Sequence, residues 1–237
     1  MNDFDTVIDP QRFVDSVRAP LECRDTKALK GLVQKLWSLD QIVSLLDSDL
    51  TDARKLAALA LGFVGDRRCI VALSVALKDR DPMVNQMAEH ALWNLWFRCG
   101  SDAAQELLQQ GSVLLGQKSY ADAAERFTMA GMSDPTYSEA WNQRAIARYF
   151  LEDYTGALAD CGIVVKLMPC HFGAWSGMGH SYAHMGQCQK AGDCYHRALA
   201  INPHLHGLQS ILRELTLRGM PPRHMECGGS DSDDFLV

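Results

Sequence analysis

Apolar residues recur at intervals of three and four through most of the chain, which is the spacing of one face of an α-helix. Two such stripes stand outside any repeat. They consist of Leu29, Leu32, Val33, Leu36 and Trp37 in the first case, and of Leu208, Ile211, Leu212 and Leu215 in the second. We predict a helix over residues 26–37 that covers the first face of the adjoining helices, a capping helix after residue 205, and a short helix over 10–17. The pattern indicates an all-α protein.

The stretch from Ala104 to Leu205 repeats three times with a period of 34 residues. The blocks are 104–137, 138–171 and 172–205, and each has a small residue at position 8, an alanine at position 20 and a proline at position 32. These residues are Gly111, Ala145 and Gly179, then Ala123, Ala157 and Ala191, then Pro135, Pro169 and Pro203. Small residues let two helices approach closely, and a proline ends a helix because it lacks the backbone donor. Three helical hairpins are therefore expected.

This period and these positions resemble the tetratricopeptide repeat (TPR) over a little under half of the chain. The resemblance implies a stack of helical hairpins, an α-solenoid, whose turns are marked by the prolines and by residues such as Lys118, Glu152 and Gly186. Two positions depart from the family pattern, where Cys161 replaces an aromatic residue and Cys188 replaces a tyrosine. Neither departure puts the fold in doubt.

A second repeat precedes the first, and its two copies are offset by 31 residues. Setting residues 46–64 against 77–95 aligns Ala57 with Ala88, Ala60 with Ala91, and Leu61 with Leu92. The two units, roughly 39–66 and 69–99, resemble a short HEAT-like repeat of the phycobilisome-lyase type. The resemblance implies that the family's Asp and Arg positions fall on Ser48 and Arg54, then on Asp79 and Asn85.

Each HEAT-like unit thus keeps one member of the family's charged pair. If the two units stack, Arg54 of the first unit could reach Asp79 of the second, and this ion pair would link the units where they meet. The alternative is a solvated surface charge that contributes less than about 1 kcal/mol.

Three large aromatic residues, Trp93, Trp96 and Phe97, end the second unit, where the first unit has Gly62 and Gly65. An aromatic surface at the end of a stack needs cover, and no flexible linker comes after it. We predict that Trp93 or Trp96 packs against a helix over 102–116, so that the units continue into the TPR array as one solenoid. The alternative is an exposed patch used for dimerisation.

The predicted organisation has five parts. They are a partly ordered segment at 1–25, HEAT-like repeats with their cap helix at 26–100, three TPR repeats at 102–205, a capping helix at 206–219 and a disordered acidic tail at 220–237. The last three residues of the tail are apolar, which leaves open that they are a ligand for another protein.

Composition narrows the function class. The 237 residues are 47% hydrophobic and carry a net charge of −6. A negative net charge argues against nucleic acid as the main partner. Eight cysteines without a close pair indicate free thiols in a reducing compartment. No run of about 18 apolar residues predicts a membrane span. We expect a cytoplasmic protein, with a monomer favoured.

Candidate chemistry is sparse. No glycine-rich phosphate loop, nucleophile elbow or framed pair of carboxylates occurs. His180 and His184 have a spacing that suits a metal, but no acidic residue between them supplies a general base. The competing interpretation, that both line a groove, is favoured. We predict no enzyme activity, no metal and no cofactor.

The TPR resemblance implies that a protein or peptide partner binds along the concave face lined by the first helix of each repeat. The residues expected to contact the partner are Gln105, Ser112, Glu139, Asn142, Ile146, Tyr149, Phe150, Ser176, His180 and His184. Asn142 is the strongest candidate because its amide both donates and accepts. The Lys, Asn and Arg clamp for chaperone C-termini is missing, since its positions fall on Leu108, Ser112, Gln143, Gly173 and Gly177.

The expected function is a non-catalytic scaffold or adaptor. The alternative, drawn from the HEAT-like half, is a chaperone-like subunit of a bilin lyase that attaches a chromophore.

Overall fold

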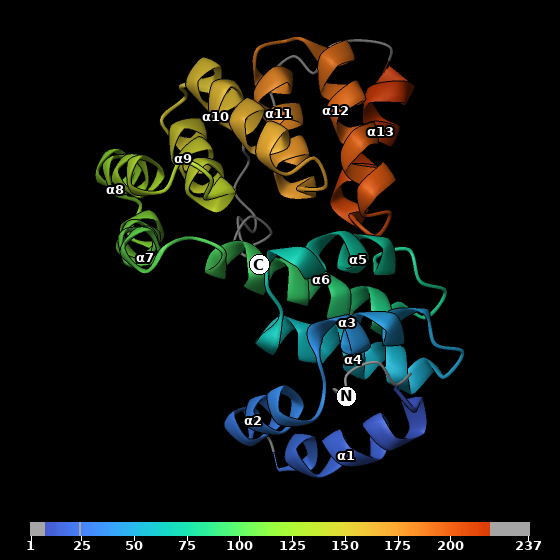
Figure 1. Ribbon diagram of the computed structural model, residues 1–237. Helices are drawn as coiled ribbons and strands as arrows, with labels where there is room; N and C mark the ends of the chain where they lie inside the picture. The colour runs from blue at the N-terminus through green and yellow to red at the C-terminus, as the bar shows by residue number, and fades with distance from the viewer. Residues whose placement is uncertain (1–7, 24, 219–237) are drawn as a thin grey trace.

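The computed structural model describes residues 8–23 and 25–218 of the chain. These residues form thirteen α-helices with short 3-10 turns and no β-strand, so the predicted all-α class is confirmed. Helical hairpins stack side by side, as a solenoid requires (Figure 1). The predicted acidic tail at 220–237 and the first seven residues lie outside the described part.

The N-terminal part is built from six α-helices. They are α1 (Pro10–Glu22), α2 (Thr26–Leu36), α3 (Leu39–Ser44), α4 (Thr51–Val64), α5 (Ile70–Ala76) and α6 (Pro82–Arg98). Helices α1 and α2 cover α4, and Phe13 packs edge-on against Trp37 with 5.0 Å between ring centroids. Helix α1 runs past the predicted end at residue 17 and contains Pro20 in its last turn, where the missing N–H removes one hydrogen bond of the helix.

Arg54 and Asp79 form the predicted link between the two N-terminal units. The Nε of Arg54 donates to Oδ2 of Asp79 at 2.7 Å and its Nη2 donates to Oδ1 at 3.1 Å, a two-bond pairing. Both side chains are largely buried, with 5% and 12% exposed. A third donation from Nη1 reaches the carbonyl of Ser48 at 2.9 Å. The solvated-charge alternative is therefore wrong.

The second part of the chain forms three hairpins and a cap. Its helices are α7 (Asp102–Gly116), α8 (Tyr120–Ser133), α9 (Ser138–Phe150), α10 (Tyr154–Leu167), α11 (Phe172–His184), α12 (Cys188–Ile201) and α13 (His206–Arg218). Each hairpin turns through a residue with positive φ, at Lys118 (60°), Glu152 (60°) and Gly186 (73°). These three positions are 34 residues apart, so the structural period equals the sequence period.

The glycines at block position 8, Gly111 and Gly179, are required by the aromatic rings that they face. A Cβ on Gly111 would lie 2.5 Å from Cε1 of Phe127, and a Cβ on Gly179 would overlap the ring of Tyr195. Both rings are almost fully buried. The glycines on α7 and α11 therefore set how closely each first helix approaches the second helix of its hairpin.

The predicted contact between the tryptophans and α7 is wrong. Trp96 stacks on His171 with 4.0 Å between ring centroids and meets Phe172 edge-on at 5.1 Å. Trp93 also contacts both of these rings. His171 is the last residue of the second block and caps the N-terminus of α11, and Phe172 is the first residue of the third block and of α11. The array curves back from α7, so that α11 to α13 lie above α5 and α6 (Figure 1).

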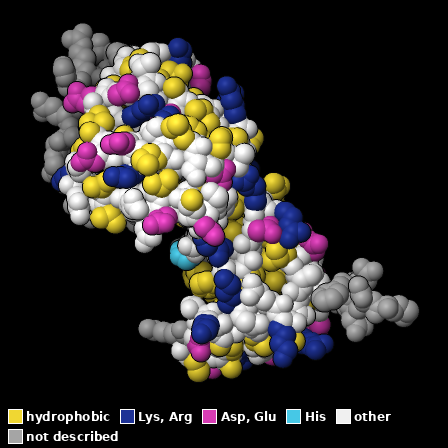
Figure 2. Space-filling view, turned by 60° about the vertical axis from the view of Figure 1, so that its left-hand side comes forward, with side chains coloured by type: hydrophobic (Ala, Val, Ile, Leu, Met, Phe, Trp, Pro, Cys, Tyr) yellow, Lys and Arg dark blue, Asp and Glu magenta, His cyan; other side chains and the backbone are white. Residues whose placement is uncertain are grey.

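The last position of each 34-residue block explains this arrangement. Tyr137, His171 and Leu205 occupy it, and all three contact the N-terminal part. The Tyr137 hydroxyl donates to the carbonyl of Phe97 at 2.6 Å, and Leu205 packs on the N-terminal core. The loops between repeats therefore form one edge of the TPR array, and this edge rests on α6 and α5. In space-filling view, the two parts meet at a narrower waist, with acidic and basic side chains interspersed over both (Figure 2).

Candidate functional site

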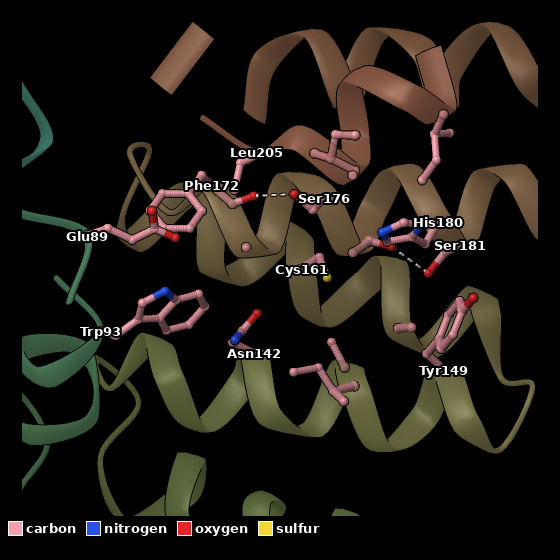
Figure 3. Close-up of a pocket in the computed structure, with 18 of the residues that line it drawn as sticks. Glu89, Trp93, Asn142, Tyr149, Cys161, Phe172, Ser176, His180, Ser181 and Leu205 are labelled. Atoms are coloured by element: carbon pink, nitrogen blue, oxygen red, sulfur yellow. Dashed lines mark hydrogen bonds between the residues drawn. The ribbon is translucent and has the colours of Figure 1, made fainter. Parts of the chain in front are cut away.

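A cavity of about 490 Å³ lies on the concave side of the TPR array. Helices α9, α11 and α13 form its walls, and Ala157 and Cys161 of α10 form its floor. Glu89 and Trp93 reach into it from α6 at one end (Figure 3). Since α6 belongs to the N-terminal part, the cavity exists in this shape only because the array curves back.

A chain of buried hydrogen bonds orients Asn142 at the cavity wall. The carboxylate of Glu139 is fully buried and accepts from Asn142 Nδ2 at 3.1 Å, from Gln143 Nε2 at 2.7 Å and from His171 Nε2 at 3.0 Å. His171 in turn accepts from the backbone N–H of Ala174 at Nδ1, so its proton lies on Nε2. This chain fixes the carboxamide of Asn142 with its nitrogen toward Glu139.

The oxygen of the Asn142 carboxamide consequently points into the cavity (Figure 3). The side chain is only 3% exposed, and within the described residues its Oδ1 accepts no hydrogen bond. Because it is not among the buried polar atoms that lack a partner, this oxygen borders the open space of the cavity. The oxygen is thus placed to receive a donor from a bound group.

His180 forms the opposite end of the cavity, with aromatic neighbours. Its Nδ1 lies 3.0 Å from the hydroxyl of Tyr195, and its ring packs edge-on against Tyr149 at 6.4 Å. Burial lowers the pKa of His180 to about 4, with a smaller contribution from His184. The imidazole is therefore neutral near pH 7, and this end of the cavity is aromatic and uncharged.

The two serine hydroxyls of the cavity are committed to the backbone of α11. The hydroxyl of Ser176 donates to the carbonyl of Phe172 at 2.9 Å, and that of Ser181 donates to the carbonyl of Gly177 at 2.9 Å (Figure 3). Burial raises the pKa of the Cys161 thiol to about 12, so this group is also neutral. The hydroxyls offer lone pairs and no protons to an occupant.

Glu89 is the only Asp, Glu, Lys or Arg among the described residues that line the cavity. Two of the positions where the chaperone-binding subfamily has its clamp, Gly173 and Gly177, do lie in the lining. They carry no side chain there. Within the described residues, the lining consequently contains no Lys or Arg that could pair with a carboxylate.

The structure brings five of the predicted site residues together around this one cavity. They are Asn142, Ile146, Tyr149, Ser176 and His180. All five come from the first helices of the second and third repeats, α9 and α11. Whether they contact a partner stays a prediction.

The other five predicted residues lie elsewhere. Glu139 is fully buried beneath the cavity, so it positions Asn142 and does not face the groove. Gln105 and Ser112 line a separate, shallow hollow on α7. Phe150 stacks on Tyr120 at 4.8 Å, and His184 stacks on Tyr154 at 5.0 Å, both outside the lining.

Sequence reasoning did not find Glu89, Trp93 or Leu205 as lining residues. Glu89 and Trp93 belong to α6, and no sequence pattern indicated that the array returns to this helix. Leu205 has the signal that could have found it, because it shares block position 34 with Tyr137 and His171.

Two further properties concern metals and membranes. Among the residues that the structure describes, no three His, Cys, Asp or Glu side chains converge as a metal site would require. His180 and His184 instead have tyrosine partners, Tyr195 and Tyr154. In the same described part, no helix combines the length and apolarity needed to cross a bilayer.

Comparison with curated proteins supports the TPR assignment. The chain is 28% identical over 126 residues to a TPR repeat-containing protein of Rhizobium etli, covering 53% of this chain and 62% of that protein. It is 27% identical over 130 residues to the Hsp70-Hsp90 organizing protein of Triticum aestivum, covering 54% of this chain and 22% of that one. The chain thus spans less than two thirds of the length of either relative. No protein-family model matches the sequence.

Solved structures with a similar fold are also TPR proteins. The first TPR of Spaghetti (RPAP3), bound to an HSP90 peptide, has a TM-score of 0.49 and 24% identity, and covers 50% of this chain and 94% of that one. YrrB, described as a TPR protein with an unusual peptide-binding site, has a TM-score of 0.46 and 17% identity, and covers 86% of this chain and 92% of that one.

Proposed function

We propose that this chain is a non-catalytic adaptor that holds a segment of a partner protein in the cavity between α9, α11 and α13. The observation that carries the proposal is the Asn142 carboxamide, which Glu139 orients so that its oxygen faces the cavity, where no donor among the described residues meets it. Few polar groups with fixed directions in a mainly apolar cavity are typical of a recognition site. The relatives include a TPR repeat-containing protein and an Hsp70-Hsp90 organizing protein, which agrees with a role in protein interactions.

The HEAT-like resemblance of residues 39–99 remains part of this proposal. The Arg54–Asp79 pair across the two units supports it. In this interpretation the HEAT-like units act as a support that closes one end of the cavity. No observation favours the chromophore-lyase alternative, and we do not propose it.

The proposal is tested by comparing the proteins that bind to the immobilised wild type and to variants of the cavity. Asn142→Ala removes the oriented acceptor, and Ser176→Phe fills the cavity from α11. The wild type is expected to retain a true partner, and each change should reduce the amount retained about tenfold or more. Asn142→Ala removes a hydrogen bond in the cavity, and Ser176→Phe removes the space that the partner occupies.

Gln189→Ala serves as the matched control, because Gln189 is an exposed residue of α12 outside the lining. It should retain the partner fully. Melting curves must show that all three variants are folded. Equal retention of every bound protein by the wild type and both cavity variants would contradict the proposal.

A further inference from the structure

We propose that the α6 end of the cavity binds the positively charged side chain of a lysine or arginine in the partner segment. This inference rests on the proposed function, because it names the chemistry of the occupant of the same cavity. Three groups on two helices carry it: Glu89 and Trp93 of α6, and Asn142 of α9.

The first step is the direction of the Asn142 amide. A carboxylate can only accept hydrogen bonds, so Glu139 Oε1, 3.1 Å away, requires the Nδ2 donor of Asn142 on its side. The carboxamide therefore presents its oxygen, an acceptor, to the cavity, while its nitrogen lies on the side of Glu139. An ammonium or guanidinium group consists of donors only, which matches this acceptor.

The second step is the pair that α6 contributes. Glu89 and Trp93 are four residues apart and so share one face of the helix, and both side chains reach into the open end of the cavity (Figure 3). A carboxylate stabilises a cation directly. An indole ring beside the same cation adds attraction through its π-electrons.

The third step is the absence of competing charge. No Lys or Arg lines the cavity within the described residues, so the Glu89 carboxylate has no positive neighbour there. The serine hydroxyls already donate to carbonyls of α11, and His180 is neutral near pH 7. An acidic side chain would meet no Lys or Arg in the lining, and it would lie in the same cavity as the Glu89 carboxylate, where like charges repel.

The walls suit the rest of a basic side chain. Ala145, Ile146 and Phe172 present apolar surface between the α6 end and Tyr149. Lysine and arginine bury their methylene stems along such surface while the charged head contacts polar groups. A cavity of about 490 Å³ leaves room for neighbouring apolar residues of the segment.

The test selects peptide ligands from random sequences, so it does not require the partner to be identified. A phage-displayed library of random dodecapeptides is panned on the full-length chain and depleted on Ser176→Phe, so that only cavity-dependent peptides remain. We expect the selected sequences to share a lysine or arginine. Replacing that residue with norleucine in the synthetic peptide should weaken binding about tenfold or more, and exchanging lysine with arginine shows which is preferred.

The Glu89→Gln variant assigns the contact. It should weaken binding of the basic peptide by a similar factor and leave the norleucine peptide unaffected, which is the signature of a direct pair. Glu125→Gln, an exposed change on α8, should have no effect.

Two outcomes separate the failures. Cavity-dependent peptides that contain no basic residue, or that bind Glu89→Gln as well as wild type, would overturn this inference and leave the proposed function standing. Failure to select any cavity-dependent peptide would overturn the proposed function, and this inference with it.

Discussion

Replacing Trp96 with alanine is expected to lower the free energy of unfolding by about 3–5 kcal/mol and to split one thermal transition into two. Trp96 is fully buried and stacks on His171 while it meets Phe172 edge-on. These contacts join helices that lie far apart in the sequence. Without them, the N-terminal part and the third repeat lose their main shared core, so differential scanning calorimetry should resolve two steps.

Two further variants isolate the cause. Trp96→Phe keeps an aromatic ring at the contact and removes the indole Nε1, which is buried without a hydrogen-bond partner among the described residues. It should retain a single transition. Phe127→Ala removes a fully buried ring within the first repeat, away from the contact, and should lower stability without separating the parts. If the wild type itself melts in two well-separated steps, the coupling of the two parts is refuted.

Replacing Gly179 with alanine is expected to destabilise the protein by about 1–3 kcal/mol, although alanine is the better helix former. A Cβ at this position would overlap the ring of Tyr195, which is 1% exposed and whose hydroxyl is bonded to His180. The ring cannot move aside without breaking that bond. The overlap therefore outweighs the gain of about 1 kcal/mol in helix propensity.

Gly162→Ala is the matched control for this change. Gly162 lies within α10, and a Cβ there would meet no atom within 4 Å beyond its own helix. This variant should be more stable than the wild type by up to about 1 kcal/mol, as chemical denaturation can measure. A stabilising effect of Gly179→Ala would show that the hairpin of the third repeat is not packed as described.

The fold of the TPR array could be predicted because its constraints are local. The 34-residue period placed the turns at Lys118, Glu152 and Gly186, and the small residue at block position 8 placed the close contact within each hairpin. Each feature depends on residues near one another in the sequence. The pairing of Arg54 with Asp79 was also predictable, since the 31-residue offset aligned the two neighbouring segments that carry them.

The relation of the two parts could not be predicted in the same way. The aromatic residues at the end of α6 indicated a buried surface, but not which segment covers it. Helix α7 is the nearest apolar segment in the sequence, whereas the curvature of the array brings His171 and Phe172 to Trp96. The curvature of the array is the sum of small rotations between successive repeats, and no single residue in the sequence indicates these rotations.

The site was predictable in part for a related reason. The TPR resemblance predicted site residues on the first helix of each repeat, and five of these residues line the cavity. It could not show that Glu139 turns inward to meet His171, because that depends on a buried partner just before the next repeat's first helix. Nor could it find Glu89 and Trp93, which reach the cavity only through the contact between the parts.

The central claim is that the third repeat rests on the N-terminal part and thereby completes the cavity. The most direct measurement is a disulfide across that contact. Ser74 of α5 and Cys170, just before α11, are within hydrogen-bonding reach of each other, although they lie far apart in the sequence. In the Ser74→Cys variant we predict a 74–170 disulfide under mild oxidation, detected as a linked peptide pair by mass spectrometry and absent from Ser74→Cys, Cys170→Ala. If the two thiols remain unlinked in folded protein, the third repeat does not rest on α5 and the central claim is wrong.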